Sequence, residues 1–87
     1  MLKLRDEDLE FREIEGEVVA LDVRTSRYIG INRTGASLWE LLRSGTDEDA
    51  MVARLVDAFG ASEEDARRDV TAFVAGLEER GLLQRTE

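Results

Sequence analysis

The stretch that decides the fold runs from Arg27 to Leu42 and reads RYIGINRTGASLWELL. It opens with an uncharged apolar segment, residues 28–31, in a chain where 37% of the residues are charged. It then changes to the spacing of an amphipathic helix, for which Asn32 or Thr34 is a suitable N-cap. We therefore expect a strand over residues 27–31, followed directly by a helix that ends near residue 43.

Two further strands are predicted before this stretch. Residues 9–15 alternate loosely between apolar and charged side chains and end at Gly16, whereas residues 17–23 are apolar and β-branched. Short connections between consecutive strands favour an antiparallel meander, with the 17–23 strand in the middle.

Two further helices are predicted after it. Thr46, with Asp49 three residues later, is the expected cap of a helix that Gly60 ends, and Ser62 with Asp65 begins a helix that Gly81 ends. The expected apolar faces are Met51, Val52, Leu55, Val56 and Phe59 on the first, and Ala66, Val70, Phe73, Val74 and Leu77 on the second.

The predicted order of elements gives the fold class. We expect one domain over residues 1–87 with an α+β, winged-helix-like fold, in which a three-stranded antiparallel sheet is followed by three helices. The helices should cover one face of the sheet.

The composition excludes several classes of function. The net charge of -8 disfavours nucleic-acid binding, and no apolar run is long enough for a membrane span. Without histidine or cysteine, the chain lacks the usual nucleophile systems and the usual zinc ligands. We interpret the acidic residues 47–49 and 63–65 as first-turn residues of helices, and we expect a cytoplasmic protein with no cofactor, no metal and no enzymatic activity.

The two edges of the predicted sheet differ in charge. The first strand carries Glu10, Arg12, Glu13 and Glu15, which discourage pairing with another chain, whereas residues 28–31 carry no charge. Two interpretations of the bare strand stay open. Either it is buried and its glycine makes room for a helix side chain, or it is an edge to which a peptide adds a strand. Gly76, inside the third helix, has the same two interpretations.

The segment Ile31-Asn32-Arg33-Thr34-Gly35, with Ala36-Ser37-Leu38-Trp39-Glu40-Leu41-Leu42 after it, resembles the strand-to-helix signature of the PqqD-like family. The later segments 69–74 and 80–83 resemble the third helix and the terminus of that family. Its members include the recognition elements that bind leader peptides of ribosomally synthesised and post-translationally modified peptides.

The resemblance implies a non-catalytic domain that binds a leader peptide along strand 27–31, in a groove facing helix 62–80. Its implied partners are a precursor peptide and a separate leader peptidase or other maturation enzyme, most like the discrete proteins of lasso-peptide biosynthesis. It implies a structural role for Thr34, Gly35 and Trp39. The implied peptide-binding residues are Arg27, Tyr28, Ile29, Gly30, Ile31, Asp69, Ala72, Phe73 and Gly76. The alternatives are a winged-helix DNA-binding domain and a homodimeric module that uses the same edge.

Overall fold

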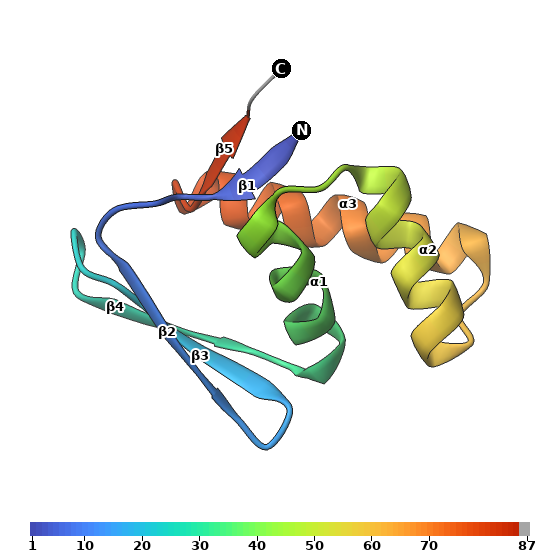
Figure 1. The fold of residues 1–87 in the computed structure, drawn as a ribbon, viewed down its shortest axis with the longest axis horizontal. Coiled ribbons are helices and arrows are strands. Elements are labelled where there is room, and N and C mark those ends of the chain that lie inside the picture. Colours follow the sequence, from blue (N-terminus) through green and yellow to red (C-terminus); the bar gives the residue numbers. More distant parts are fainter. Residues whose placement is uncertain (86–87) are drawn as a thin grey trace.

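The chain folds into a three-stranded antiparallel sheet followed by three helices, and a second, two-stranded sheet joins its two ends. The computed structural model describes residues 1–85. Figure 1 shows the three-stranded sheet projecting from one side of the helices, with α1 next to it. The elements are β1 (Leu2–Leu4), β2 (Leu9–Ile14), β3 (Glu17–Asp22), β4 (Arg27–Ile31), α1 (Arg33–Ser44), α2 (Glu48–Phe59), α3 (Glu63–Glu79) and β5 (Leu83–Arg85). The predicted α+β class and the order of the three-stranded sheet and helices are confirmed.

The three-stranded sheet has the predicted meander order, β2-β3-β4. Glu15 and Gly16 form the first turn with φ values of 52° and 83°, the left-handed backbone that a two-residue hairpin of type I′ requires. Ile14 and Glu17 pair across this turn, and β3 pairs along its other side with β4. The sheet therefore has two free edges, one on β2 and one on β4.

Side chains cap the three helices at their N-termini. The Asn32 carboxamide oxygen accepts a hydrogen bond from the Gly35 N–H at 2.9 Å, and the Ser62 hydroxyl accepts one from the Asp65 N–H at 3.1 Å. Both caps agree with the sequence. The prediction for α2 is wrong, because Asp47, and not Thr46, accepts the capping hydrogen bond.

Thr46 is displaced from the cap position by a contact that no local sequence pattern indicates. Its N–H and C=O both bond to Leu2, at 2.7 and 2.6 Å, in an isolated antiparallel bridge. Leu2 begins β1, which pairs with β5, so residues 82–85 form more than the packed tail that we expected. Figure 1 shows these two strands side by side. Because Leu2 and Leu4 are buried, β1 closes one end of the core.

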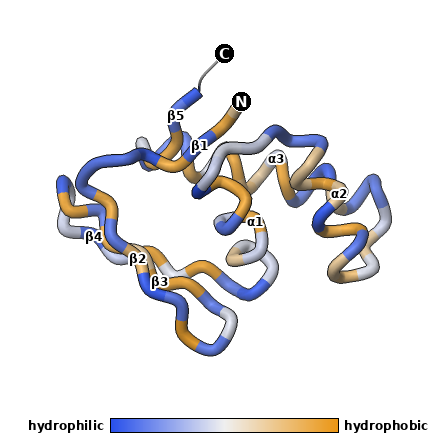
Figure 2. Tube along the Cα trace, in the orientation of Figure 1, coloured by the Kyte–Doolittle hydropathy of each residue, from blue (hydrophilic) through white to orange (hydrophobic). Residues whose placement is uncertain are grey.

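The core lies between the helices and the inner face of the three-stranded sheet. Figure 2 shows hydrophobic and hydrophilic residues alternating along the elements that line it. Trp39 is 1% exposed, and the Phe11 ring of β2 meets it edge-on at 5.5 Å, which holds α1 on the sheet. Phe59 is an incorrect prediction: it is the last residue of α2 and stays 44% exposed. The largest fully buried side chains are Trp39, Leu38, Leu42, Met51, Leu55, Leu82 and Val70.

Candidate functional site

The free edge of β4 presents unpaired backbone groups at alternate residues. Ile14 and Glu17 close a two-residue hairpin, and such a closing pair exchanges both of its backbone hydrogen bonds. Bonding direction alternates along a strand, so the odd-numbered residues of β3 bond to β2 and the even-numbered ones bond to β4. The residues of β4 that bond to β3 are therefore Arg27, Ile29 and Ile31. The N–H and C=O groups of Tyr28 and Gly30 point outward.

A cavity of about 290 Å³ lies between this edge and α3. The α3 residues that line it, Ala72, Phe73, Gly76 and Leu77, are all small or apolar. Ile31 is buried and Ile29 half-buried, which places their side chains on the same face as the helices. The lining residues are Ile29, Gly30, Ile31, Asn32, Ala72, Phe73, Gly76, Leu77 and Arg80.

Two of the lining residues are glycines that no neighbour requires to be small. A Cβ atom placed on Gly30 or on Gly76 would have no heavy atom of a neighbouring residue within 4 Å. No helix side chain therefore occupies the position that a Gly30 side chain would take, and Gly76 does not pack closely against the sheet. The structure therefore does not support the interpretation that Gly30 and Gly76 are small in order to pack closely against a neighbouring element.

Two further cavities continue the first one in both directions. One of about 420 Å³ shares Ile29 and Arg80 with it and extends to Asp22 and Glu79. The other, of about 460 Å³, shares Asn32, Ala72 and Phe73 with it and extends to Thr34 and Asp69. The first two cavities lie between β4 and the end of α3, and the third lies between α1 and α3. Because neighbouring cavities share lining residues, we treat the three together and call them the β4–α3 groove.

The structure brings most of the predicted site residues together. Ile29, Gly30, Ile31, Ala72, Phe73 and Gly76 all line the central cavity. Arg27 lies at one end of the groove and Asp69 at the other. The Tyr28 side chain is separate, because strand alternation places it on the outer face of the sheet, 73% exposed, in a cavity that Val19 and Leu21 also line.

Three residues of the central cavity, Asn32, Leu77 and Arg80, were not among the predicted peptide-binding residues. Leu77 was assigned to the core, and it is 4% exposed while still contributing to the groove wall. Arg80 comes directly after α3 and lies four residues after Gly76, a spacing that places both residues on the same side of a helix. That spacing could have indicated Arg80 as a lining residue. Asn32 was identified only as a cap, a role that it also fills.

The two ends of the groove carry different charged side chains. Arg27 and Arg80 line one end together with Asp22 and Glu79, and Asp69 lines the other. Within residues 1–85, neither arginine has a hydrogen bond or ion pair from its side chain to another residue, and Asp69 has none either. These charges are therefore available to a ligand that lies along the groove.

Other kinds of site find no support in the described residues. No group of three or more acidic, histidine or cysteine side chains within residues 1–85 is arranged to hold a metal ion. None of the helices in the same range is both long and apolar enough to span a membrane.

Comparison with known proteins gives one family and two similar structures. The family described as "Coenzyme PQQ synthesis protein D (PqqD)" matches residues 17–83. A structure described as "TbiB1 in Complex with the TbiA(beta) Leader Peptide" is 26% identical, with a TM-score of 0.86 and 98% of each chain covered. "Lasso peptide synthetase B1 complexed with the leader peptide" is also 26% identical, with a TM-score of 0.83, and the match covers 97% of this chain and 98% of that one. No curated protein matches the chain.

Proposed function

The chain belongs to the PqqD family, and we propose that it is a non-catalytic module that captures the leader segment of a ribosomally synthesised precursor peptide. The leader adds a strand to β4, lies in the β4–α3 groove, and is presented to a separate processing enzyme, a leader peptidase. Both similar structures are described as complexes with a leader peptide, which supports this choice of ligand.

One observation carries the proposal: a free strand edge and an open groove coincide on β4. The edge offers outward N–H and C=O groups at Tyr28 and Gly30, and the groove beside it is open at both Gly30 and Gly76. Strand addition needs these two features together, because the ladder supplies hydrogen bonds and the pockets receive alternate side chains. The opposite edge, β2, carries charged residues along its length.

Binding of this kind requires no chemistry from the module. A disordered leader loses conformational entropy when it docks, and ladder hydrogen bonds and a few apolar anchors offset that loss. The bound leader then holds the core of the precursor near the enzyme, which raises its effective concentration there. Arg27 and Asp69, at opposite ends of the groove, favour one register of the leader over others.

The DNA-binding alternative loses its candidate contacts. Arg67 on α3 pairs with Asp49 at 3.0 Å, and Arg68 pairs with Asp65 at 3.2 Å. Both guanidinium groups are thus partly neutralised by carboxylates on a chain with a net charge of -8.

Proline substitution at the free edge tests the proposal. A panel of fluorescein-labelled leader peptides of lasso-peptide precursors, beginning with the TbiA(beta) leader, is titrated into the protein and followed by anisotropy. Gly30→Pro removes an outward N–H but no bond to β3, so the protein should stay folded and bind its best leader about tenfold more weakly. Glu13→Pro is the matched control, since Glu13 also points its N–H outward, but on the β2 edge.

The proposal fails if no member of the panel shows saturable binding, or if Gly30→Pro binds as tightly as the unmodified chain. Molecular mass in solution, measured with and without peptide, tests the homodimer alternative. A dimer that a leader peptide dissociates would show that both partners use the same edge.

A further inference from the structure

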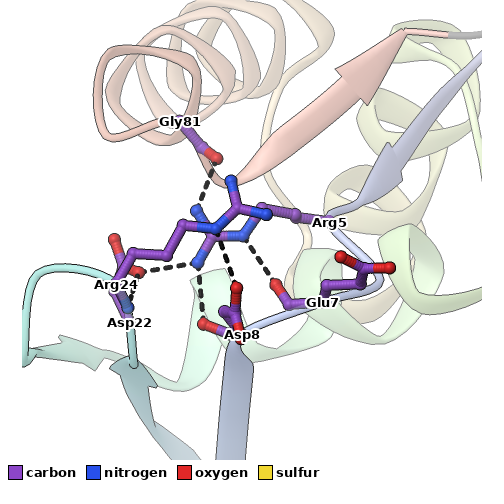
Figure 3. Close-up of polar contacts among 6 residues, drawn as sticks. All are labelled: Arg5, Glu7, Asp8, Asp22, Arg24 and Gly81. Atoms are coloured by element: carbon purple, nitrogen blue, oxygen red, sulfur yellow. Dashed lines mark hydrogen bonds and ion pairs between the residues drawn. The ribbon is translucent and has the colours of Figure 1, made fainter.

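Arg5 joins three distant segments of the chain through one partly buried guanidinium group. It follows β1, and its side chain is 12% exposed. Its Nε donates to the Glu7 carbonyl at 2.8 Å, Nη1 to the Gly81 carbonyl at 3.0 Å, and Nη2 to the Asp8 carbonyl at 2.7 Å. Nη2 also meets Asp22 Oδ1 at 2.6 Å. Figure 3 shows this arrangement, which we call the Arg5 clasp.

Asp22 anchors the clasp on the sheet. It is the last residue of β3 and is 4% exposed, and Oδ1 also accepts the Arg24 N–H at 3.1 Å. The hydrogen bond from Arg5 is the main reason that the pKa of the Asp22 carboxyl lies below its usual range, and those from the Arg24 N–H and the Thr25 side chain lower it further. The carboxylate therefore stays ionised at neutral pH, with its position fixed.

The clasp sits at one end of the β4–α3 groove. On the sheet side, Asp22 itself lines the end cavity of about 420 Å³. On the helix side, Gly81 follows Arg80, which lines the same cavity. At the other end, α1 packs between the two walls so tightly that a Cβ on Gly35 would lie 2.7 Å from Ile31 Cγ2 and 3.0 Å from Phe73 Cε1.

In the part of the chain that the structure describes, the three-stranded sheet makes no direct polar contact with α3. Within the described 85 residues, no ion pair or side-chain hydrogen bond joins residues 9–31 to α3 itself. Apolar packing through α1 thus joins the two walls at one end of the groove, and the Arg5 guanidinium bridges Asp22 and Gly81 at the other. A groove that is fixed at both ends before it binds has less freedom to lose on binding.

We propose that Arg5 is a positioning residue that sets the width of the β4–α3 groove before a peptide enters it. Arg5 touches no part of the central cavity, and it acts through Asp22 and the end of α3. The expected effect on binding rests on the proposed function. The geometry of the Arg5 clasp does not, because it exists in the free protein.

Arg5→Met removes the polar bridge and retains most of the apolar stem, and Arg5→Lys keeps the charge but loses the planar fork. Leader affinity of Arg5→Met, measured while circular dichroism shows the variant folded, should fall about tenfold, with Arg5→Lys between it and the unmodified chain. Arg24→Met is the matched control. It breaks the neighbouring exposed Arg24–Asp8 pair and reaches no part of α3, so affinity should stay within about twofold.

A distance measurement separates positioning from stability. The chain contains no cysteine, so spin labels at Val23→Cys and Ala75→Cys, both exposed and outside the groove lining, report the separation of sheet and α3. In the absence of peptide, the distribution of distances between the two spin labels should be narrow when Arg5 is present and broad when it is replaced by Met. Peptide should narrow it again.

Two results would overturn the inference: a folded Arg5→Met variant with unchanged affinity, or one whose free-state distribution is as narrow as that of the unmodified chain. If the unmodified chain binds no leader, the proposed function fails, while the distance measurement still tests the clasp.

Discussion

Replacing Gly76 by alanine should stabilise the protein and weaken its binding at the same time. Gly76 lies inside α3, and an added Cβ would meet no neighbouring atom within 4 Å. The methyl group therefore fits the free protein without strain. It would project into the β4–α3 groove, which Gly76 lines together with Ala72 and Phe73.

The two effects have different magnitudes and different origins. Alanine in a helix is more favourable than glycine by about 0.5–1 kcal/mol, because glycine loses more backbone freedom on folding. In a domain of this size, that gain raises Tm by about 2–8 °C. A peptide already packed against Gly76 would meet the extra methyl group, and overpacking of this kind costs about 1–3 kcal/mol, so Kd should rise at least about fivefold.

Thermal unfolding by circular dichroism measures the first effect, and anisotropy titration with the best-binding leader measures the second. Thr71→Ala is the matched control. Thr71 is an exposed residue of α3 that does not line the groove, and alanine there also improves helix propensity. The control should therefore raise Tm and leave Kd unchanged.

Two outcomes would refute the reasoning. A Gly76→Ala protein that is more stable but binds normally would show that the peptide does not approach Gly76. A lower Tm would show that the space beside this glycine is not open.

Three further predictions concern the fold. Asp47→Ala removes the cap of α2 and should lower the free energy of unfolding, measured by urea denaturation, by about 1 kcal/mol, whereas Thr46→Ala should leave the cap intact. Leu4→Ala should cost about 2–5 kcal/mol in the same assay, since Leu4 is 5% exposed, and a loss under 1 kcal/mol would contradict the role of β1 in the core. The pKa of the Asp22 carboxyl is lower in the folded chain than in the unfolded one. The ionised carboxylate therefore stabilises the folded protein above about pH 4, and this stabilisation is lost as the pH falls through the folded pKa. Asp22→Asn should reduce the fall in the free energy of unfolding that is measured on acidification.

Local sequence patterns were sufficient for the central elements of the fold. Alternation in residues 9–23, the bare segment 28–31 and the apolar stripe of α3 predicted strands and helices that the structure contains. The pairing of β1 with β5 was missed because it joins residues about 80 positions apart, through strands of three residues that carry little pattern of their own. A second contact of β1, the bridge between Leu2 and Thr46, explains the wrong cap, since it holds Thr46 in extended backbone.

The sequence was sufficient to predict which two elements form the candidate site, but not whether the space between them is open. Charge asymmetry indicated β4 as the uncharged one of the two edges, and the family resemblance, with the small residues on α3, indicated the facing wall. Whether Gly30 and Gly76 pack against neighbours could not be decided from local patterns, because that depends on the separation of two elements. The Arg5 clasp, which contributes to this separation, depends on contacts between residues 5, 22 and 81, and no local pattern indicates them.

The free edge of β4 is short, and on the proposed binding mode this affects how a precursor evolves. With Tyr28 and Gly30 as its outward residues, an added strand gains about four backbone hydrogen bonds, or about 2–6 kcal/mol net. Micromolar binding requires about 8 kcal/mol, so the side chains that enter the groove must supply the remainder. Selection would then preserve those few leader positions and leave the intervening ones free to drift, so that one recognition module continues to serve precursors whose sequences have diverged.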